Sequence, residues 1–232
     1  MTTSAAPSRR ILVRIAILAL ILGVLALVLA GWASRWRPDR ETWPVQGVTL
    51  SASNGAVHWG RLKAAGADFA YLQASSGAKQ RDARFLANRD GARAAKVRYG
   101  ALHRFNLCEL ATLQAANFDT LVPRDGDALP PAVAIDYSEN CADRPTQAML
   151  ESELTTFLAQ VESHVGRRAI LMPSPDVAAD YSFGDFKRPL WLSRDFRAPE
   201  EGSIWRMWQA STRAHVDGAD GQVSWNVINP AK

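Results

Sequence analysis

Residues 68–105 read DFAYLQASSGAKQRDARFLANRDGARAAKVRYGALHRF and contain a complete strand–helix–strand unit. The runs 68–74 and 97–103 are short and apolar, as strands are, and the stretch 83–95 between them has a helical pattern. Because the strands are continuously apolar rather than alternating, we expect them to be parallel and covered on both faces. The unit therefore predicts an α/β protein built on a parallel sheet.

The same alternation of strands and helices continues on both sides of this unit. Further strands are predicted at 45–50, 132–137, 169–173, 189–192, 204–209 and within 216–228, and further helices at 57–65, 107–121 and 147–165. The later strands have little helix between them, which favours an α/β barrel with a degenerate second half over an open, doubly wound sheet. In such barrels, functional residues lie at the C-terminal ends of the strands.

An uncharged apolar run at 15–33 precedes this domain. It is long enough to cross a bilayer core as a helix. Arg9, Arg10 and Arg14 lie before it, and positive flanking charge tends to stay in the cytoplasm. We therefore expect a cytoplasmic segment 1–14, a transmembrane helix 15–33, a linker 34–44 and a periplasmic or extracellular domain 45–232.

A cleaved signal peptide is the alternative to an anchor. Residues 28–30, Val-Leu-Ala, resemble a small-x-small cleavage site, but the apolar run is longer than a usual signal sequence. Trp32, Trp36 and Trp43 flank the run, where aromatic side chains often lie at a membrane interface. Both interpretations export the domain.

The basic charge of the chain belongs to its N-terminal part. Residues 1–44 hold six arginines and two acidic residues, whereas basic and acidic residues balance in the remainder. This distribution argues for contact with anionic lipid and against nucleic acid as a partner. Both cysteines, Cys108 and Cys141, lie in the exported part, where a pair usually forms a disulfide; two buried free thiols are the alternative.

Several kinds of catalytic site are absent from the sequence. There is no glycine-rich phosphate loop and no G-x-S-x-G nucleophile motif. The four histidines are scattered without metal-ligand spacing, and neither cysteine has a C-x-x-C partner. No metal and no cofactor are predicted.

Carboxylates and aromatic residues follow the predicted strands. Asp136 lies at the end of strand 132–137, either as an acid on the functional face or as a structural aspartate, and Glu139 follows it in the loop. Glycoside hydrolysis normally needs two carboxylates, and no convincing second acid pairs with Asp136. Aromatic rings that would suit either a carbohydrate groove or the core are those of Tyr137, Trp191, Trp205, Trp208 and Trp225.

Residues 45–229 resemble glycoside hydrolase family 25, the lysozymes that cleave the muramic acid linkage of peptidoglycan. The family fold is a modified α/β barrel, and six segments match its motifs in order. They are 45–55 (VQGVTLSASNG), 68–77 (DFAYLQASSG), 82–105 (ending GALHRF), 129–133 (LPPAV), 208–211 (WQAS) and 216–226 (VDGADGQVSWN). The resemblance implies a lysozyme fold, a peptidoglycan substrate and no cofactor.

The departures from the family fall on its acidic residues. Thr49 stands at the first-strand aspartate, Ser76 at the glutamate after the second strand, and Ser224 at the aspartate near the C-terminus. Ala134 occupies the aspartate of the D-x-E motif, and Asp136 its glutamate, one methylene shorter. Asp136 is therefore the one catalytic candidate that the resemblance leaves.

The resemblance also implies glycan-binding residues and a disulfide. The glycan-binding candidates are His103, Tyr137, Trp191, Trp208 and Gln209. Cys108 follows the third strand and Cys141 the fourth, and neighbouring strand ends can meet within disulfide reach.

Three functions remain open at this point. The first is a membrane-anchored lysozyme-like domain that engages peptidoglycan but hydrolyses it weakly or not at all. The second is a working muramidase with Asp136 as its acid. The third is a non-catalytic scaffold protein of the cell envelope.

Overall fold

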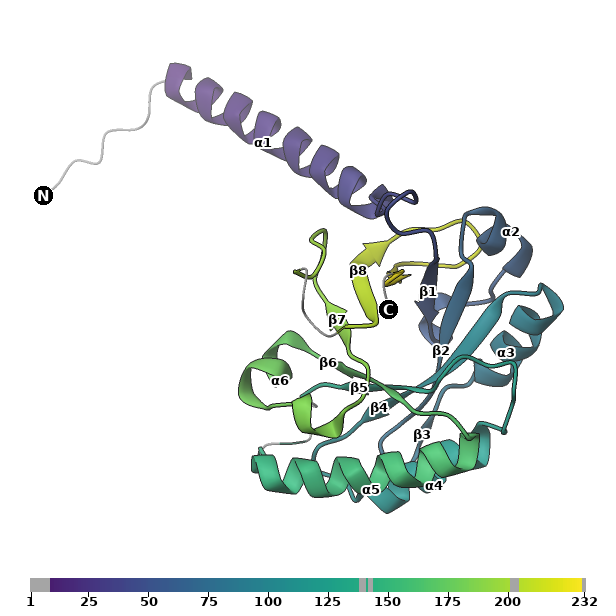
Figure 1. The fold of residues 1–232 in the computed structure, drawn as a ribbon. Helices are drawn as coiled ribbons and strands as arrows, with labels where there is room; N and C mark the ends of the chain where they lie inside the picture. The colour runs from purple at the N-terminus through teal and green to yellow at the C-terminus, as the bar shows by residue number, and fades with distance from the viewer. Residues whose placement is uncertain (1–8, 138–140, 142–143, 201–204, 231–232) are drawn as a thin grey trace, which may run out of the picture.

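The computed structural model describes residues 9–137, 141, 144–200 and 205–230 and folds most of them around one strongly curved sheet (Figure 1). Its strands are β1 (Gln46–Leu50), β2 (Phe69–Ser76), β3 (Gln80–Arg81), β4 (Arg98–Phe105), β5 (Ala132–Ile135), β6 (Ile170–Pro173), β7 (Trp191–Ser193), β8 (Met207–Ala214) and β9 (Val223–Ile228). The helices are α1 (Arg9–Arg35), α2 (Trp59–Ala64), α3 (Phe85–Ala94), α4 (Ala111–Leu121), α5 (Gln147–Val165) and α6 (Pro175–Asp180), with 3₁₀ turns at Ala52–Asn54 and Gly184–Phe186.

The sheet is a nearly closed barrel. Its strand order is β6-β5-β4-β2-β1-β9-β8-β7, and β3 pairs only with the end of β2. A single parallel bridge, Leu171 to Leu190, connects the two ends of this order. The pairs β1–β2, β2–β4, β4–β5, β5–β6 and β7–β8 are parallel, whereas β9 is antiparallel to both of its neighbours. The predicted α/β barrel with a degenerate second half is confirmed.

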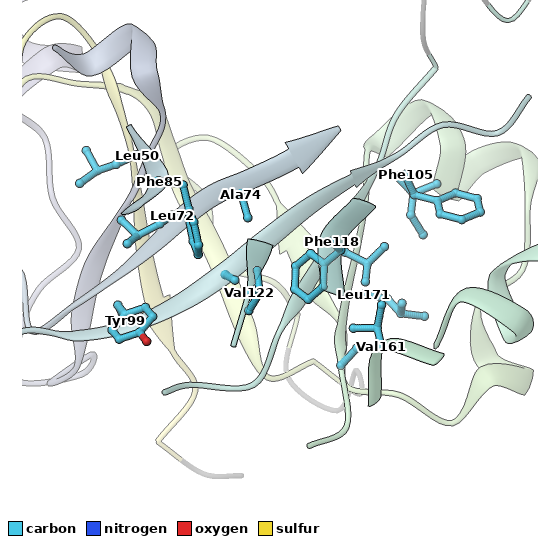
Figure 2. Close-up of a cluster of buried hydrophobic side chains, with 14 of the residues drawn as sticks. Leu50, Leu72, Ala74, Phe85, Tyr99, Phe105, Phe118, Val122, Val161 and Leu171 are labelled. Carbon is cyan, nitrogen blue, oxygen red and sulfur yellow. The ribbon is translucent and has the colours of Figure 1, made fainter. Parts of the chain in front are cut away.

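Helices α3, α4 and α5 cover the outer face of the first half of the barrel (Figure 1). The apolar side chains between sheet and helices form the largest core cluster, part of which Figure 2 shows. Phe85 of α3, Phe118 of α4 and Phe157 of α5 are fully buried there. The helical periodicity of these segments thus supplies one apolar stripe per helix to the outer face of the sheet.

A second core cluster fills the inside of the barrel. Strand residues alternate between the inner and outer faces, so Phe69 and Tyr71 of β2 point inward while Leu72 points outward. Trp191 of β7 is fully buried among the inward residues, with its ring centroid 4.8 Å from that of Tyr71. This layer closes the barrel below its C-terminal end.

The segment between α1 and β1 packs on the outer face of β8. The ring of Trp36 lies 6.3 Å from that of Trp208, and the ring of Trp43 lies 5.7 Å from it. Arg37 places its guanidinium 4.5 Å from the ring of Trp225 on β9. Trp36 and Trp43 thus cover this part of the barrel with half-buried rings.

Helix α1 is longer than the predicted span 15–33. It covers Arg9–Arg35, and its most apolar 18-residue window has a mean hydropathy of 3.0 with none of that window buried. At 1.5 Å per residue, 27 residues extend about 40 Å, enough to cross a bilayer. A membrane anchor has this length and composition, and a signal sequence near the N-terminus also meets the criteria of apolar length and hydropathy.

Candidate functional site

A cavity of about 220 Å³ opens at the C-terminal end of the barrel strands, and we call it the mouth cavity. Residues of all the barrel strands except β3 line it, together with Asp136 after β5 and with Ser174 and Pro175 after β6. Its lining residues are Thr49, Gln73, Leu102, Arg104, Ala134, Asp136, Met172, Pro173, Ser174, Pro175, Ser193, Gln209 and Ser224. This is the end at which α/β barrels carry their functional residues.

Four positions at which the resemblance places acids line this cavity. Thr49 of β1 pairs with Ser224 of β9, and both side chains line the cavity. Ala134 of β5 lies on the inward face, and Asp136 follows two residues later with the same orientation. The site that the resemblance implies therefore exists as a place in the fold, with neutral residues at Thr49, Ala134 and Ser224.

Asp136 is held by an arginine. The Arg104 Nη2 donates to Asp136 Oδ2 at 2.6 Å, and the side chains are 48% and 35% exposed. Arg104 lies on β4 in register with Ala134 of β5, directly beside an emptied acid position. Among the described lining residues, Asp136 is the only carboxylate and Arg104 the only cation. The charge within this lining is therefore balanced.

The rest of the lining is neutral and polar. Gln209 Nε2 donates to Ser193 Oγ at 2.8 Å across β8 and β7. Beneath the cavity, buried Asn226 donates from Nδ2 to Thr49 Oγ1 at 3.0 Å. The Oδ1 of Asn226 has no partner among the described residues, so the floor of the cavity keeps an unused acceptor.

One position that the resemblance places among the catalytic acids does not line the mouth cavity. Ser76 lines a separate cavity with Glu109 and Lys79, on the far side of the β2 end. Its predicted place among the degenerate catalytic positions is therefore not supported by a shared cavity. Glu139 lies outside the described residues.

His103 points away from the mouth cavity, which corrects its assignment as a glycan-binding residue. Its fully buried ring stacks on Phe157 at 4.7 Å, between β4 and α5. Nε2 donates to Gln114 Oε1 at 3.2 Å, so Nδ1 accepts from the Ser75 hydroxyl at 2.8 Å. Burial lowers the pKa of His103 to about 4. The ring is therefore a neutral core group.

Trp191 and Trp208 are also core residues, and their predicted stacking on a glycan is wrong for this arrangement. The ring of Trp191 is fully buried inside the barrel below the cavity. Trp208 points to the opposite, outer face and donates from Nε1 to the Arg194 carbonyl at 2.7 Å. Neither ring has a free face for a sugar.

Of the remaining glycan-binding candidates, Gln209 lines the cavity and Tyr137 does not. The Tyr137 hydroxyl donates to Asp180 Oδ2 at 2.6 Å, and the Arg144 guanidinium lies 4.1 Å from its ring centroid. Tyr137 is half-buried beside the mouth, so its glycan contact stays a prediction.

The two cysteines form a disulfide, as the resemblance implies. Cys108 follows β4 and Cys141 follows β5, with their Cα atoms 5.5 Å apart. The bond ties together the loops that continue from Arg104 and Asp136. It thereby constrains one side of the mouth cavity.

Arg104 is a residue of the mouth cavity that was not predicted from the sequence. Strand β4 continues to Phe105, beyond the predicted end at His103, and alternation then puts Leu102 and Arg104 inside and His103 outside. A charged residue two positions after an inward leucine, at the C-terminal end of a barrel strand, was the available signal.

Comparison with known proteins gives a consistent family. The sequence model described as Glycosyl hydrolases family 25 matches residues 48–219. Lysozyme M1 of Streptomyces globisporus is 28% identical over 216 residues, covering 86% of this chain and 73% of that protein. The uncharacterized protein YegX of Escherichia coli K12 is 31% identical over 200 residues, covering 84% of this chain and 67% of YegX.

Solved structures agree on the fold. A family 25 glycosyl hydrolase from Bacillus anthracis superposes with a TM-score of 0.75 at 24% identity, covering 84% of this chain and 92% of that one. A bacterial lysozyme from Streptomyces coelicolor gives a TM-score of 0.69 at 25% identity, with coverages of 80% and 92%.

Proposed function

The chain belongs to glycosyl hydrolases family 25, and from that premise we propose that its mouth cavity binds peptidoglycan glycan strands with weak or no hydrolysis. The observation that carries the proposal is the Arg104–Asp136 ion pair in a cavity whose other described lining residues are uncharged. A site of this kind offers hydrogen bonds to a saccharide but lacks the charges that cleave one.

The chemistry of hydrolysis explains why this pair matters. Glycosidases of both stereochemical classes normally use two carboxylates about 5–10 Å apart and pass through a transition state resembling an oxocarbenium ion. One of the two carboxylate oxygens of Asp136, Oδ2, accepts a hydrogen bond from Arg104, so it is less available to protonate a leaving group. The guanidinium also opposes positive charge that develops on the sugar. Both effects disfavour cleavage while leaving polar groups for binding.

The N-terminal helix supports a location at the membrane as part of the same proposal. Arg9, Arg10 and Arg14 lie at its start, so the positive-inside rule places this end in the cytoplasm and the domain outside. The disulfide is consistent with an oxidising compartment. We infer a single-pass anchor that holds a peptidoglycan-binding domain close to the membrane.

A working muramidase is the second candidate, favoured by the carboxylate that remains in the cavity and by the likeness to Lysozyme M1. In that case Asp136 is the acid. The two candidates differ in one observable, the release of soluble sugar from peptidoglycan.

Binding is tested with the full-length chain in detergent, sedimented with purified sacculi. We expect retention above that of an unrelated detergent-solubilised membrane protein. Ser224→Phe fills the cavity and is expected to abolish retention, whereas Ser152→Phe, on the exposed face of α5, serves as the matched control. Equal sedimentation of wild type and Ser224→Phe would reject the mouth cavity as the binding site.

A further inference from the structure

We propose that Arg104 is a specificity-determining residue that recognises a carboxylate on the glycan, in competition with Asp136. The inference rests on the proposed function and deepens it, because it names the group that the mouth cavity selects. It predicts a preference for acidic over neutral saccharides.

The position of Arg104 supports this role. It pairs in register with Ala134, so a guanidinium stands beside a place where the family has a carboxylate. The resemblance places several carboxylates at this site. Among the described residues that line the cavity of this chain, Arg104 is the only cation. The guanidinium can attract an anion at this position once Asp136 shares or releases it, whereas a carboxylate in the same place would repel that anion.

The guanidinium has free hydrogen-bonding capacity. An arginine carries five N–H donors, and the described contact of Arg104 uses one nitrogen, Nη2, on one oxygen of Asp136. The side chain is 48% exposed, so its other donors face solvent or the cavity. A carboxylate can therefore bind the arginine through two parallel hydrogen bonds, the geometry that guanidinium favours.

The size of the cavity points to a substituent rather than a whole saccharide. Sites for drug-sized ligands are about 300–1,000 Å³, whereas the mouth cavity holds about 220 Å³. A glycan strand would lie across the mouth and insert one group. Gln73 and Gln209 line the same cavity and supply neutral donors to that group.

Asp136 acts as an internal competitor in this arrangement. While no ligand is bound, it neutralises Arg104 at 2.6 Å. A ligand carboxylate has to replace or share that contact. Removing the charge of Asp136 is therefore expected to strengthen binding of acidic ligands, opposite in sign to removing Arg104.

In peptidoglycan the carboxylate has two sources: the stem peptide, and the lactyl group of muramic acid where no peptide is attached to it. Two acidic probes separate these sources: glycan strands with stem peptides, and strands stripped of their peptides by an amidase. Each is compared with the same preparation after its carboxylates have been converted to methylamides. Neutral N-acetylglucosamine oligomers serve as the uncharged reference. Binding is measured with the full-length chain in detergent micelles by calorimetry or fluorescence.

For the wild type we expect tighter binding to carboxylate-bearing strands than to their amides. Arg104→Met should weaken binding of the acidic strands about ten- to a hundredfold and leave the neutral probes unchanged, since a hydrogen bond to a charged group contributes about that factor. Arg104→Lys should recover only part of the loss. Asp136→Asn should tighten binding of acidic strands several-fold.

The outcomes separate the two proposals. Binding of stripped strands that depends on Arg104 identifies the lactyl carboxylate, and dependence seen only with peptide-bearing strands identifies the stem peptide. Wild-type binding that is insensitive to amidation and to both substitutions overturns the carboxylate assignment alone. No binding of any probe overturns the proposed function as well. A disulfide and circular dichroism spectrum like those of the wild type confirm that each variant is folded.

Discussion

The barrel strands with the side chains packed on their two faces, which we call the wall, differ from the mouth cavity in which features of the family they share. The wall is apolar, with Trp191 inside and Trp208 and Trp225 outside, all three almost fully buried. The mouth carries Thr49, Ala134 and Ser224 where the resemblance places acids. The wall thus keeps the fold, while the mouth carries one ion pair, Arg104 with Asp136, among otherwise uncharged described residues. This pattern is expected if the chain needs the shape of the site more than its catalytic chemistry.

The same comparison separates two roles of conspicuous residues. Tryptophans in the motifs look suited to sugar stacking, yet both candidates among them support the sheet. The groups that face the cavity are small or neutral polar side chains together with Arg104 and Asp136. Substitutions in the wall should therefore change stability, and substitutions in the mouth should change binding.

The largest expected effect is on the wall. Trp208→Ala removes a fully buried ring and its hydrogen bond to the Arg194 carbonyl. Replacing a buried tryptophan by alanine typically costs about 3–5 kcal/mol. Urea denaturation of the full-length chain in detergent, followed by fluorescence, measures this loss. A change in the free energy of unfolding below about 1 kcal/mol would mean that Trp208 contributes little to the stability of the barrel.

The buried ring of His103 should make the stability of the wall depend on pH. Its folded-state pKa is lowered to about 4 by burial, below the unfolded value near 6.5. The unfolded state therefore takes up the proton first, so stability is complete above about pH 6.5 and falls as the pH decreases toward 4. The loss between pH 7 and pH 4 should be about 3 kcal/mol.

The measurement for His103 is the free energy of unfolding against pH. His103→Gln removes the titrating group while keeping hydrogen-bonding capacity at the site. The difference between wild type and variant isolates the contribution of His103 from that of the carboxylates. Parallel curves for the two proteins between pH 7 and pH 4 would contradict the burial of a neutral ring.

Trp43 tests the segment that covers the outer wall. Its ring is half-buried against Trp205 and Trp208, so Trp43→Ala should destabilise the full-length chain by about 2 kcal/mol, less than a core tryptophan. Thr42→Ala, at an exposed neighbouring position, should change stability by less than about 0.5 kcal/mol. Equal effects of the two substitutions would show that the segment 34–44 is a loose linker.

The smallest expected effect on stability is in the mouth. Ser224→Ala removes a hydroxyl that lines the cavity without a described hydrogen bond, and the free energy of unfolding should change by less than about 0.5 kcal/mol. A loss comparable to that of Trp208→Ala would end the distinction between wall and mouth. Thermal denaturation of both variants under identical conditions provides the comparison.

The fold was largely predictable because its local signals agree with its packing. Helix α5 was predicted at its observed bounds, Gln147–Val165. Thr146 caps its first turn by accepting from the Met149 N–H, and Gly166 ends it in the left-handed conformation at φ 76°. Such caps are readable from sequence alone.

The site was less predictable because it depends on which face each side chain takes. Strand β4 continues two residues past its predicted end, so Arg104 lies inside the strand and lines the cavity, whereas its neighbour His103 lies on the outer face. Neighbouring residues of a strand point to opposite faces of the sheet. Gln209 lies on the inner face and lines the cavity, so Trp208 beside it lies on the outer face. The flat rings of Trp191 and Trp208 suggested a carbohydrate groove. Their positions along the strands determine which face they take, and both rings are buried.

The central claim is tested most directly by the release of reducing sugar from purified peptidoglycan. The full-length chain and its Asp136→Asn variant are incubated in parallel, with a known muramidase as positive control. We expect both proteins to release far less reducing sugar than the positive control, and we expect the Asp136→Asn variant to release as much as the wild type. Release by the wild type that disappears in Asp136→Asn would show a working muramidase and contradict the account.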